Sequence, residues 1–118
     1  MTTDDVIIWH NPRCSKSRAV LDRLTARGVN PIVVRYLDTP PDAVKIAAVL
    51  GILGVDARAL IRKGEPEYKA LGLDDPAIGD SALIAAMAAH PKLIERPVVI
   101  HRQRAVIGRP TEAVDSLF

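Results

Sequence analysis

A short apolar run, Val6–Trp9, meets a proline turn and then a helical pattern, and this succession constrains the fold more than any other part of the chain. The turn and the first helical residues read His10-Asn-Pro-Arg-Cys-Ser-Lys-Ser-Arg18. Apolar residues at helical spacing predict a helix over 15–27, and Gly28 follows as a stop signal. Residues 32–36 are β-branched and short, which predicts a second strand. Strand, helix and strand within about 30 residues predict a βαβ unit with parallel strands and a right-handed crossover.

The rest of the chain changes from helices to strands. Helical patterns cover residues 43 to about 50–53, 57–62, 67–71 and 81–89. Their start signals are Pro41 at a first helical position, and Asp56 and Asp80 as N-caps. Residues 98–101 and 105–107 predict a β-hairpin, and 110–117 predict a last short helix.

The order of these elements predicts an α/β protein with a thioredoxin-like fold. Its mixed four-stranded sheet would be built in the order β-α-β and then β-β-α, with a helical insertion at about residues 42–90 between the two halves. We expect residues 1–118 to form one domain, because a chain of this length supports one core.

Composition excludes several classes of protein. Hydrophobic residues at 48% and charged residues at 25% are typical of a soluble globular protein. A net charge of +2 is too small by itself to indicate nucleic-acid binding, and one Trp, two Tyr and one Phe are few for a base-stacking platform. No apolar run approaches the roughly 18 residues of a membrane span, and the first residues lack the pattern of a signal peptide, so we expect a cytoplasmic protein. No Cys/His cluster has metal-ligand spacing and no glycine-rich phosphate loop is present, so we expect no metal and no bound cofactor.

Cys14, the single cysteine, has two interpretations. A lone cysteine is most often a small buried hydrophobe. Here the flanks are polar or charged and a proline turn precedes it, which is typical of an exposed functional loop. At a helix start, unpaired N–H groups and the positive end of the helix dipole stabilise a thiolate. We therefore favour a reactive thiolate, with positive charge nearby from Arg18 and its neighbours.

Three arginines at element boundaries are candidates for oxyanion binding: Arg62 ends a helix, Arg96 precedes Pro97, and Arg109 lies between glycine and proline. The planar guanidinium fork matches tetrahedral oxyanions, so converging arginines would clamp one. For each arginine alone a surface role is at least as common. His10 could hydrogen-bond within the cysteine loop, or could be structural.

The chain resembles the glutaredoxin-dependent arsenate reductase family. The resemblance rests on motifs spread over nearly the whole chain: His10–Arg18, Tyr36-Leu-Asp-Thr-Pro40, Arg58-Ala-Leu-Ile-Arg62, Tyr68-Lys-Ala-Leu-Gly-Leu73, His90-Pro91, Arg96-Pro97-Val98 and Gly108-Arg-Pro110.

The resemblance implies a catalytic pair, Cys14 as nucleophile and His10 as its activator. It implies substrate binding by Arg62, Arg96 and Arg109, and a cis peptide before Pro97. Ser17, Arg18 and Pro97 would support the site.

The implied reaction is reduction of arsenate to arsenite, with glutathione as co-substrate and glutaredoxin as partner. Cys14-Ser-Lys-Ser17 offers no second thiol, so the second sulfur would come from another molecule. Two alternatives stay open: a glutathione-dependent thiol-disulfide oxidoreductase acting on another substrate, and a thioredoxin-like binding or regulatory protein.

Overall fold

The computed structural model describes residues 5–118, which form two compact units. One unit, here called the sheet unit, combines the chain up to Thr39 with Arg96–Phe118. The other, the helical unit, is Pro40–Glu95.

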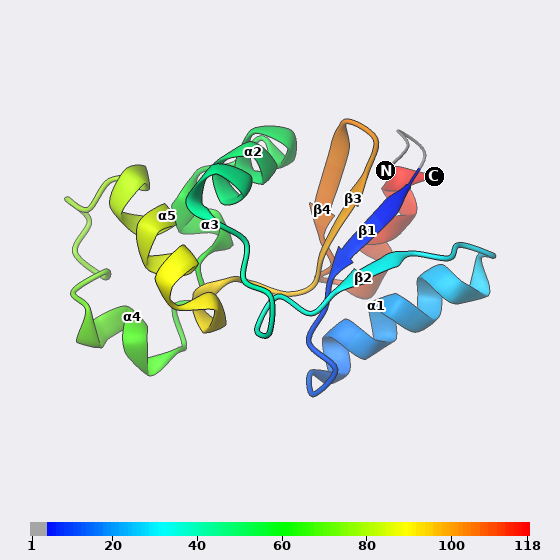
Figure 1. The fold of residues 1–118 in the computed structure, drawn as a ribbon, viewed down its shortest axis with the longest axis horizontal. Helices are drawn as coiled ribbons and strands as arrows, with labels where there is room; N and C mark the ends of the chain where they lie inside the picture. The colour runs from blue at the N-terminus through cyan, green and yellow to red at the C-terminus, as the bar shows by residue number, and fades with distance from the viewer. Residues whose placement is uncertain (1–4) are drawn as a thin grey trace. The chain divides into compact units, whose positions relative to one another are not determined.

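The sheet unit contains a four-stranded mixed sheet in the order β2-β1-β3-β4 (Figure 1). Its elements are β1 (Val6–Trp9), α1 (Ser15–Ala26), β2 (Ile32–Val34), β3 (Val98–His101), β4 (Arg104–Ile107) and the 3₁₀ helix η2 (Thr111–Leu117). β1 pairs in parallel with β2 and antiparallel with β3, and β3 pairs antiparallel with β4. The predicted βαβ unit and hairpin are confirmed, and the arrangement is thioredoxin-like.

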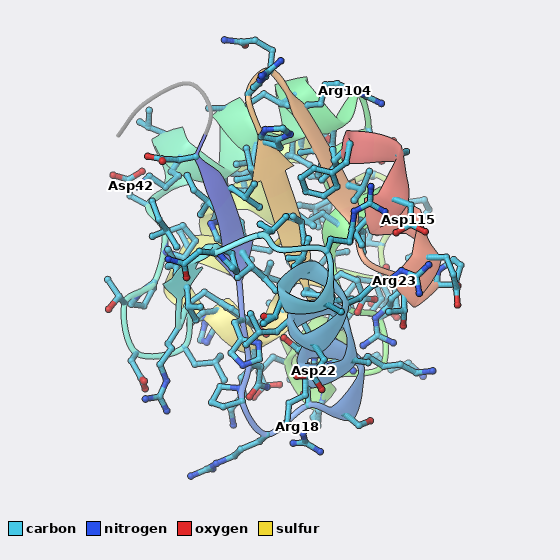
Figure 2. The ribbon with its side chains drawn as sticks, turned by 90° about the vertical axis from the view of Figure 1, so that its right-hand side faces the viewer. Arg18, Asp22, Arg23, Asp42, Arg104 and Asp115 are labelled. Carbon is cyan, nitrogen blue, oxygen red and sulfur yellow. The ribbon has the colours of Figure 1, made fainter. Side chains whose placement is uncertain are left out.

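The core of the sheet unit lies between one face of the sheet and the helices α1 and η2. Buried side chains come from the strands and from both helices: Val6, Ile8, Val20, Leu24, Val99, Val114 and Leu117. Each such side chain contributes about 1.5–3 kcal/mol when it leaves water. At the surface Arg23 of α1 donates through Nε to Asp115 of η2 at 2.9 Å, and Figure 2 shows these two side chains pointing toward each other. This packing fixes α1, and with it the cysteine loop, against the sheet.

The helical unit is an assembly of short helices. They are α2 (Ala43–Leu53), α3 (Ala57–Leu60), α4 (Pro66–Ala70), α5 (Asp80–Ala89) and the 3₁₀ helix η1 (Pro91–Leu93). α5 packs against α2, α3 and η1, with Leu83 and Met87 among the buried side chains. Asp56 caps α3 as predicted, accepting from the Ala59 N–H at 3.1 Å. Within residues 5–118 no helix is both long and apolar enough to cross a membrane.

Several element boundaries differ from the sequence prediction. β2 ends at Val34 because the Arg35 carbonyl accepts the N–H groups of Asp38 and Thr39 and so forms a turn. α2 begins at Ala43.

Two predicted start signals are wrong, and the last helix has another geometry. Asp42 caps α2 by accepting the Lys45 N–H at 2.8 Å, so Pro41 lies before the cap and not inside the helix. Asp80 is the first residue of α5, and not its cap. The predicted last helix is a 3₁₀ helix.

Candidate active site

The cysteine loop places Cys14 at the N-cap of α1. Asn11 shapes the turn, since its side-chain Oδ1 accepts the Arg13 N–H at 3.0 Å and its carbonyl accepts the Cys14 N–H at 3.0 Å. Cys14 itself has an extended backbone, and its carbonyl accepts the Arg18 N–H at 3.0 Å, the first bond of the helix. Its side chain therefore stands where the free N–H groups of the first helical turn point.

The thiol of Cys14 is more buried than the sequence indicates. Only 9% of the residue is exposed, so the expectation of an exposed loop cysteine is wrong in this respect. Burial raises the pKa of the Cys14 thiol, but hydrogen bonding from the Ser17 N–H, the Arg96 guanidinium and the Lys16 N–H together outweigh it and leave the pKa below its usual value. The N-terminal turn of α1 and one arginine thus favour the thiolate even in a largely buried position.

Arg96 and Arg109 meet at the thiol from the two ends of the β3–β4 hairpin. Arg109 Nη2 lies 4.0 Å from Cys14 Sγ, and Arg109 Nε donates to the Arg96 carbonyl at 2.8 Å. Their chain neighbours are also linked, because the Gly108 N–H donates to the Pro97 carbonyl at 2.8 Å. The Arg96–Pro97 peptide is cis, as the resemblance implies; the Arg109–Pro110 peptide is also cis, which was not predicted.

Gly108 is a site residue whose importance the sequence does not reveal. A Cβ at this position would lie 2.8 Å from Val20 Cγ2 and 2.9 Å from Pro97 Cγ. Only a residue without a side chain lets the strand end approach both α1 and Pro97. The single hint in the sequence is that Gly108 directly precedes Arg109.

His10 and Ser17 form a buried pair behind the cysteine loop. His10 Nδ1 lies 2.6 Å from Ser17 Oγ, and the same oxygen accepts the Asn11 N–H at 3.0 Å. Burial, with the positive charges of Arg35 and Arg18, lowers the pKa of His10, so the ring is favoured in its neutral form. A neutral Nδ1 can accept the Ser17 hydroxyl proton, which would place the ring proton on Nε2. This contact agrees with both open interpretations of His10, a hydrogen-bonding partner in the cysteine loop and a structural histidine.

Arg18 stabilises the loop, because its Nη1 donates to the Pro12 carbonyl at 2.8 Å. The sheet unit therefore brings together Cys14, His10, Ser17, Arg18, Arg96, Pro97 and Arg109. Arg62 belongs to the helical unit, and its part in an oxyanion site stays a prediction.

No metal site is visible in the part of the chain that the structure describes. Across residues 5–118 no group of three or more His, Cys, Asp or Glu side chains could hold a metal ion. The chemistry at hand is that of a stabilised thiolate beside two guanidinium groups, an arrangement suited to nucleophilic attack on an anionic centre.

These features define a thioredoxin-like protein with a cysteine thiol of lowered pKa at the start of its first helix. The profile of the ArsC family matches residues 9–117, and the chain belongs to that family. It is 46% identical to an arsenate reductase of Neisseria meningitidis serogroup A over 97% of this chain and 98% of the relative. It is 51% identical to the uncharacterised protein YfgD of Escherichia coli K12, over 95% of each chain. The solved arsenate reductase of Vibrio cholerae matches with a TM-score of 0.95 and 44% identity, over 99% of this chain and 100% of that one.

Proposed function

We propose that this protein is an arsenate reductase that uses glutathione and glutaredoxin as its reductants. The observation that carries the proposal is the Cys14 thiol at the N-terminus of α1, with its pKa lowered and with Arg109 Nη2 4.0 Å from the sulfur. The arsenate reductases among its relatives support arsenate as the substrate.

The first step is attack of the Cys14 thiolate on arsenic(V). A sulfur–arsenic bond forms, and one arsenate oxygen takes up protons and leaves as water. Arg96 and Arg109 hold the remaining oxygens and balance their negative charge, and Arg62 is the third arginine of this proposed clamp. His10 is the second member of the proposed catalytic pair, and its contact with Ser17 in the first turn of α1 orders the loop that presents the Cys14 thiol.

The second step needs an external thiol, because the chain has one cysteine. The glutathione thiol attacks the Cys14 sulfur of the adduct. The sulfur–arsenic bond breaks, and its electron pair stays on arsenic, which becomes arsenite. Cys14 and glutathione together lose two electrons and form a mixed disulfide. A glutaredoxin thiol then attacks this disulfide, carries away the glutathione and returns Cys14 to its reduced state.

The test is arsenite formation from arsenate by purified protein with glutathione and glutaredoxin. Cys14→Ser should abolish the activity, because a serine hydroxyl is not ionised at neutral pH. Full activity in that variant would refute the proposed nucleophile. Reduction of glutathionylated disulfides with no turnover of arsenate would instead identify the alternative, a thiol-disulfide oxidoreductase.

The arginine clamp is tested by Arg96→Lys and Arg109→Lys. Both should weaken arsenate binding, because lysine lacks the two-pronged fork. Arg104→Lys is the matched control: Arg104 is exposed on β4 (Figure 2) and lies outside the proposed clamp. An arsenate KM and kcat unchanged in both clamp variants would exclude the clamp.

A further inference from the structure

Within the helical unit Arg62 lies between two carboxylates. Its Nη1 is 3.5 Å from Glu65 Oε1, and its Nε is 3.7 Å from Glu95 Oε1. The three side chains are 22%, 25% and 27% exposed in that order, so solvent screens these charges only in part. One positive charge is therefore surrounded by two negative charges.

Local structure brings each carboxylate to the arginine. Arg62 and Glu65 are the ends of a turn, in which the Arg62 carbonyl accepts the Glu65 N–H at 3.4 Å. Glu95 arrives through an antiparallel bridge between Ile61 and Ile94. In this bridge the Arg62 N–H donates to the Leu93 carbonyl at 2.7 Å, and the Glu95 N–H donates to the Leu60 carbonyl at 2.8 Å. The diagonal positions of Arg62 and Glu95 then share one side of the bridge.

The two ion pairs are longer than good hydrogen bonds, which measure about 2.7–3.2 Å. Arg62 Nη1 is buried and makes no hydrogen bond within residues 5–118. The guanidinium thus keeps donor capacity for an oxyanion, while two carboxylates lie beside it. Glu65 makes no side-chain cap bond to α4, although it occupies the N-cap, so its carboxylate has no capping role there.

We propose that Glu65 and Glu95 tune oxyanion binding, because both carboxylates limit the affinity of Arg62 for tetrahedral oxyanions. The proposal rests on the proposed function in one respect, namely that Arg62 binds the oxyanion. An incoming dianion must compete with both carboxylates for the Arg62 guanidinium. The pair therefore weakens capture of tetrahedral oxyanions in general, including phosphate and sulfate.

The experiment measures the Kd of inorganic phosphate by calorimetry and the KM of arsenate in the reductase assay. The variants are Glu65→Gln, Glu95→Gln and the double variant, which keep the size of each side chain and remove its charge. Each single variant should lower both constants about two- to fivefold, the size expected of a partly exposed ion pair, and the double variant should lower them further. Glu112→Gln, on the exposed part of η2, removes one negative charge elsewhere and should change neither constant by as much as twofold.

The same substitutions in an Arg62→Ala background separate the possible outcomes. If the carboxylates act through Arg62, Glu65→Gln should have no effect on the phosphate Kd once Arg62 is gone. If Arg62→Ala weakens phosphate binding and the glutamate variants do not strengthen it, the proposal on the carboxylates is overturned while Arg62 keeps its role. If Arg62→Ala leaves phosphate and arsenate binding unchanged, the role of Arg62 in the proposed function falls, and the present proposal falls with it.

Discussion

Gly108 offers the sharpest test of how the fold positions the site. In Gly108→Ala the new Cβ would lie 2.8 Å from Val20 Cγ2 and 2.9 Å from Pro97 Cγ. Carbon atoms in contact prefer about 3.5–4.0 Å, so the new Cβ must separate from both neighbours by roughly 0.6–0.7 Å. Val20 is fully buried and the Pro97 ring is rigid, so neither can yield without a shift of α1 or of the β3–β4 hairpin.

The expected cost follows from two opposing effects. Overpacking of a core costs about 1–3 kcal/mol, while replacing glycine with alanine restricts the unfolded chain and returns about 0.4–1 kcal/mol. The free energy of unfolding should fall by about 1–2 kcal/mol, and the Tm by about 4–8 °C at roughly 4 °C per kcal/mol. Arsenate reduction should also fall, because Arg109 follows Gly108 directly and would move with it.

Urea unfolding followed by far-ultraviolet circular dichroism measures this change. Gly51→Ala is the matched control, because Gly51 lies inside α2 and a Cβ there meets nothing within 4 Å. That variant should raise the free energy of unfolding by about 0.5–1 kcal/mol. A Gly108→Ala protein as stable as Gly51→Ala would show that the close approach to Val20 and Pro97 has no energetic weight.

Three further predictions concern the groups around the thiol. Arg96→Ala should raise the pKa of the Cys14 thiol, since it removes a hydrogen bond to the thiolate and a positive charge; alkylation rates across pH measure this, and an unchanged pKa would contradict it. Ser17→Ala should lower the free energy of unfolding in urea by about 1–3 kcal/mol, because His10 Nδ1 and the Asn11 N–H lose a buried partner; a loss near zero would mean that the hydroxyl is dispensable. The free energy of unfolding should also fall as the pH drops below about 6.5 and through the lower pKa of His10 in the folded protein. The reason is that the His10 ring binds a proton more readily in the unfolded chain than in its buried folded position. This part of the pH dependence should vanish in His10→Gln, and its persistence there would assign it to another group.

Sequence periodicity predicted most of the fold because the decisive signals are local. A few neighbouring residues are enough to show the apolar pattern of each of three elements: Val6–Trp9, the helix after Cys14 and the hairpin after Pro97. The predicted helix boundaries were wrong where a side chain bonds to a backbone group about one turn along the chain. Pro41 suits a first helical position, but the Asp42 side chain caps the helix one residue later.

The site was harder to predict because its contacts join distant parts of the chain. Nothing near Gly108 in the sequence reveals that Val20 occupies the space where a side chain would stand. The neighbours of Cys14 indicated an exposed thiol, whereas the packed sheet unit leaves 9% of the residue exposed. The arginines were found by their position next to glycine and proline, but only the structure brings Arg109 Nη2 to the Cys14 sulfur.

The pKa of the Cys14 thiol tests the central claim most directly. The chain has a single cysteine, so the rate of alkylation by iodoacetamide as a function of pH reports on Cys14 alone, and Cys14→Ser provides the blank. We predict a pKa below the usual value of about 8.5 for a cysteine thiol, because the α1 N–H groups and Arg96 outweigh the effect of burial. A pKa at or above that value would contradict the assignment of Cys14 as an activated nucleophile.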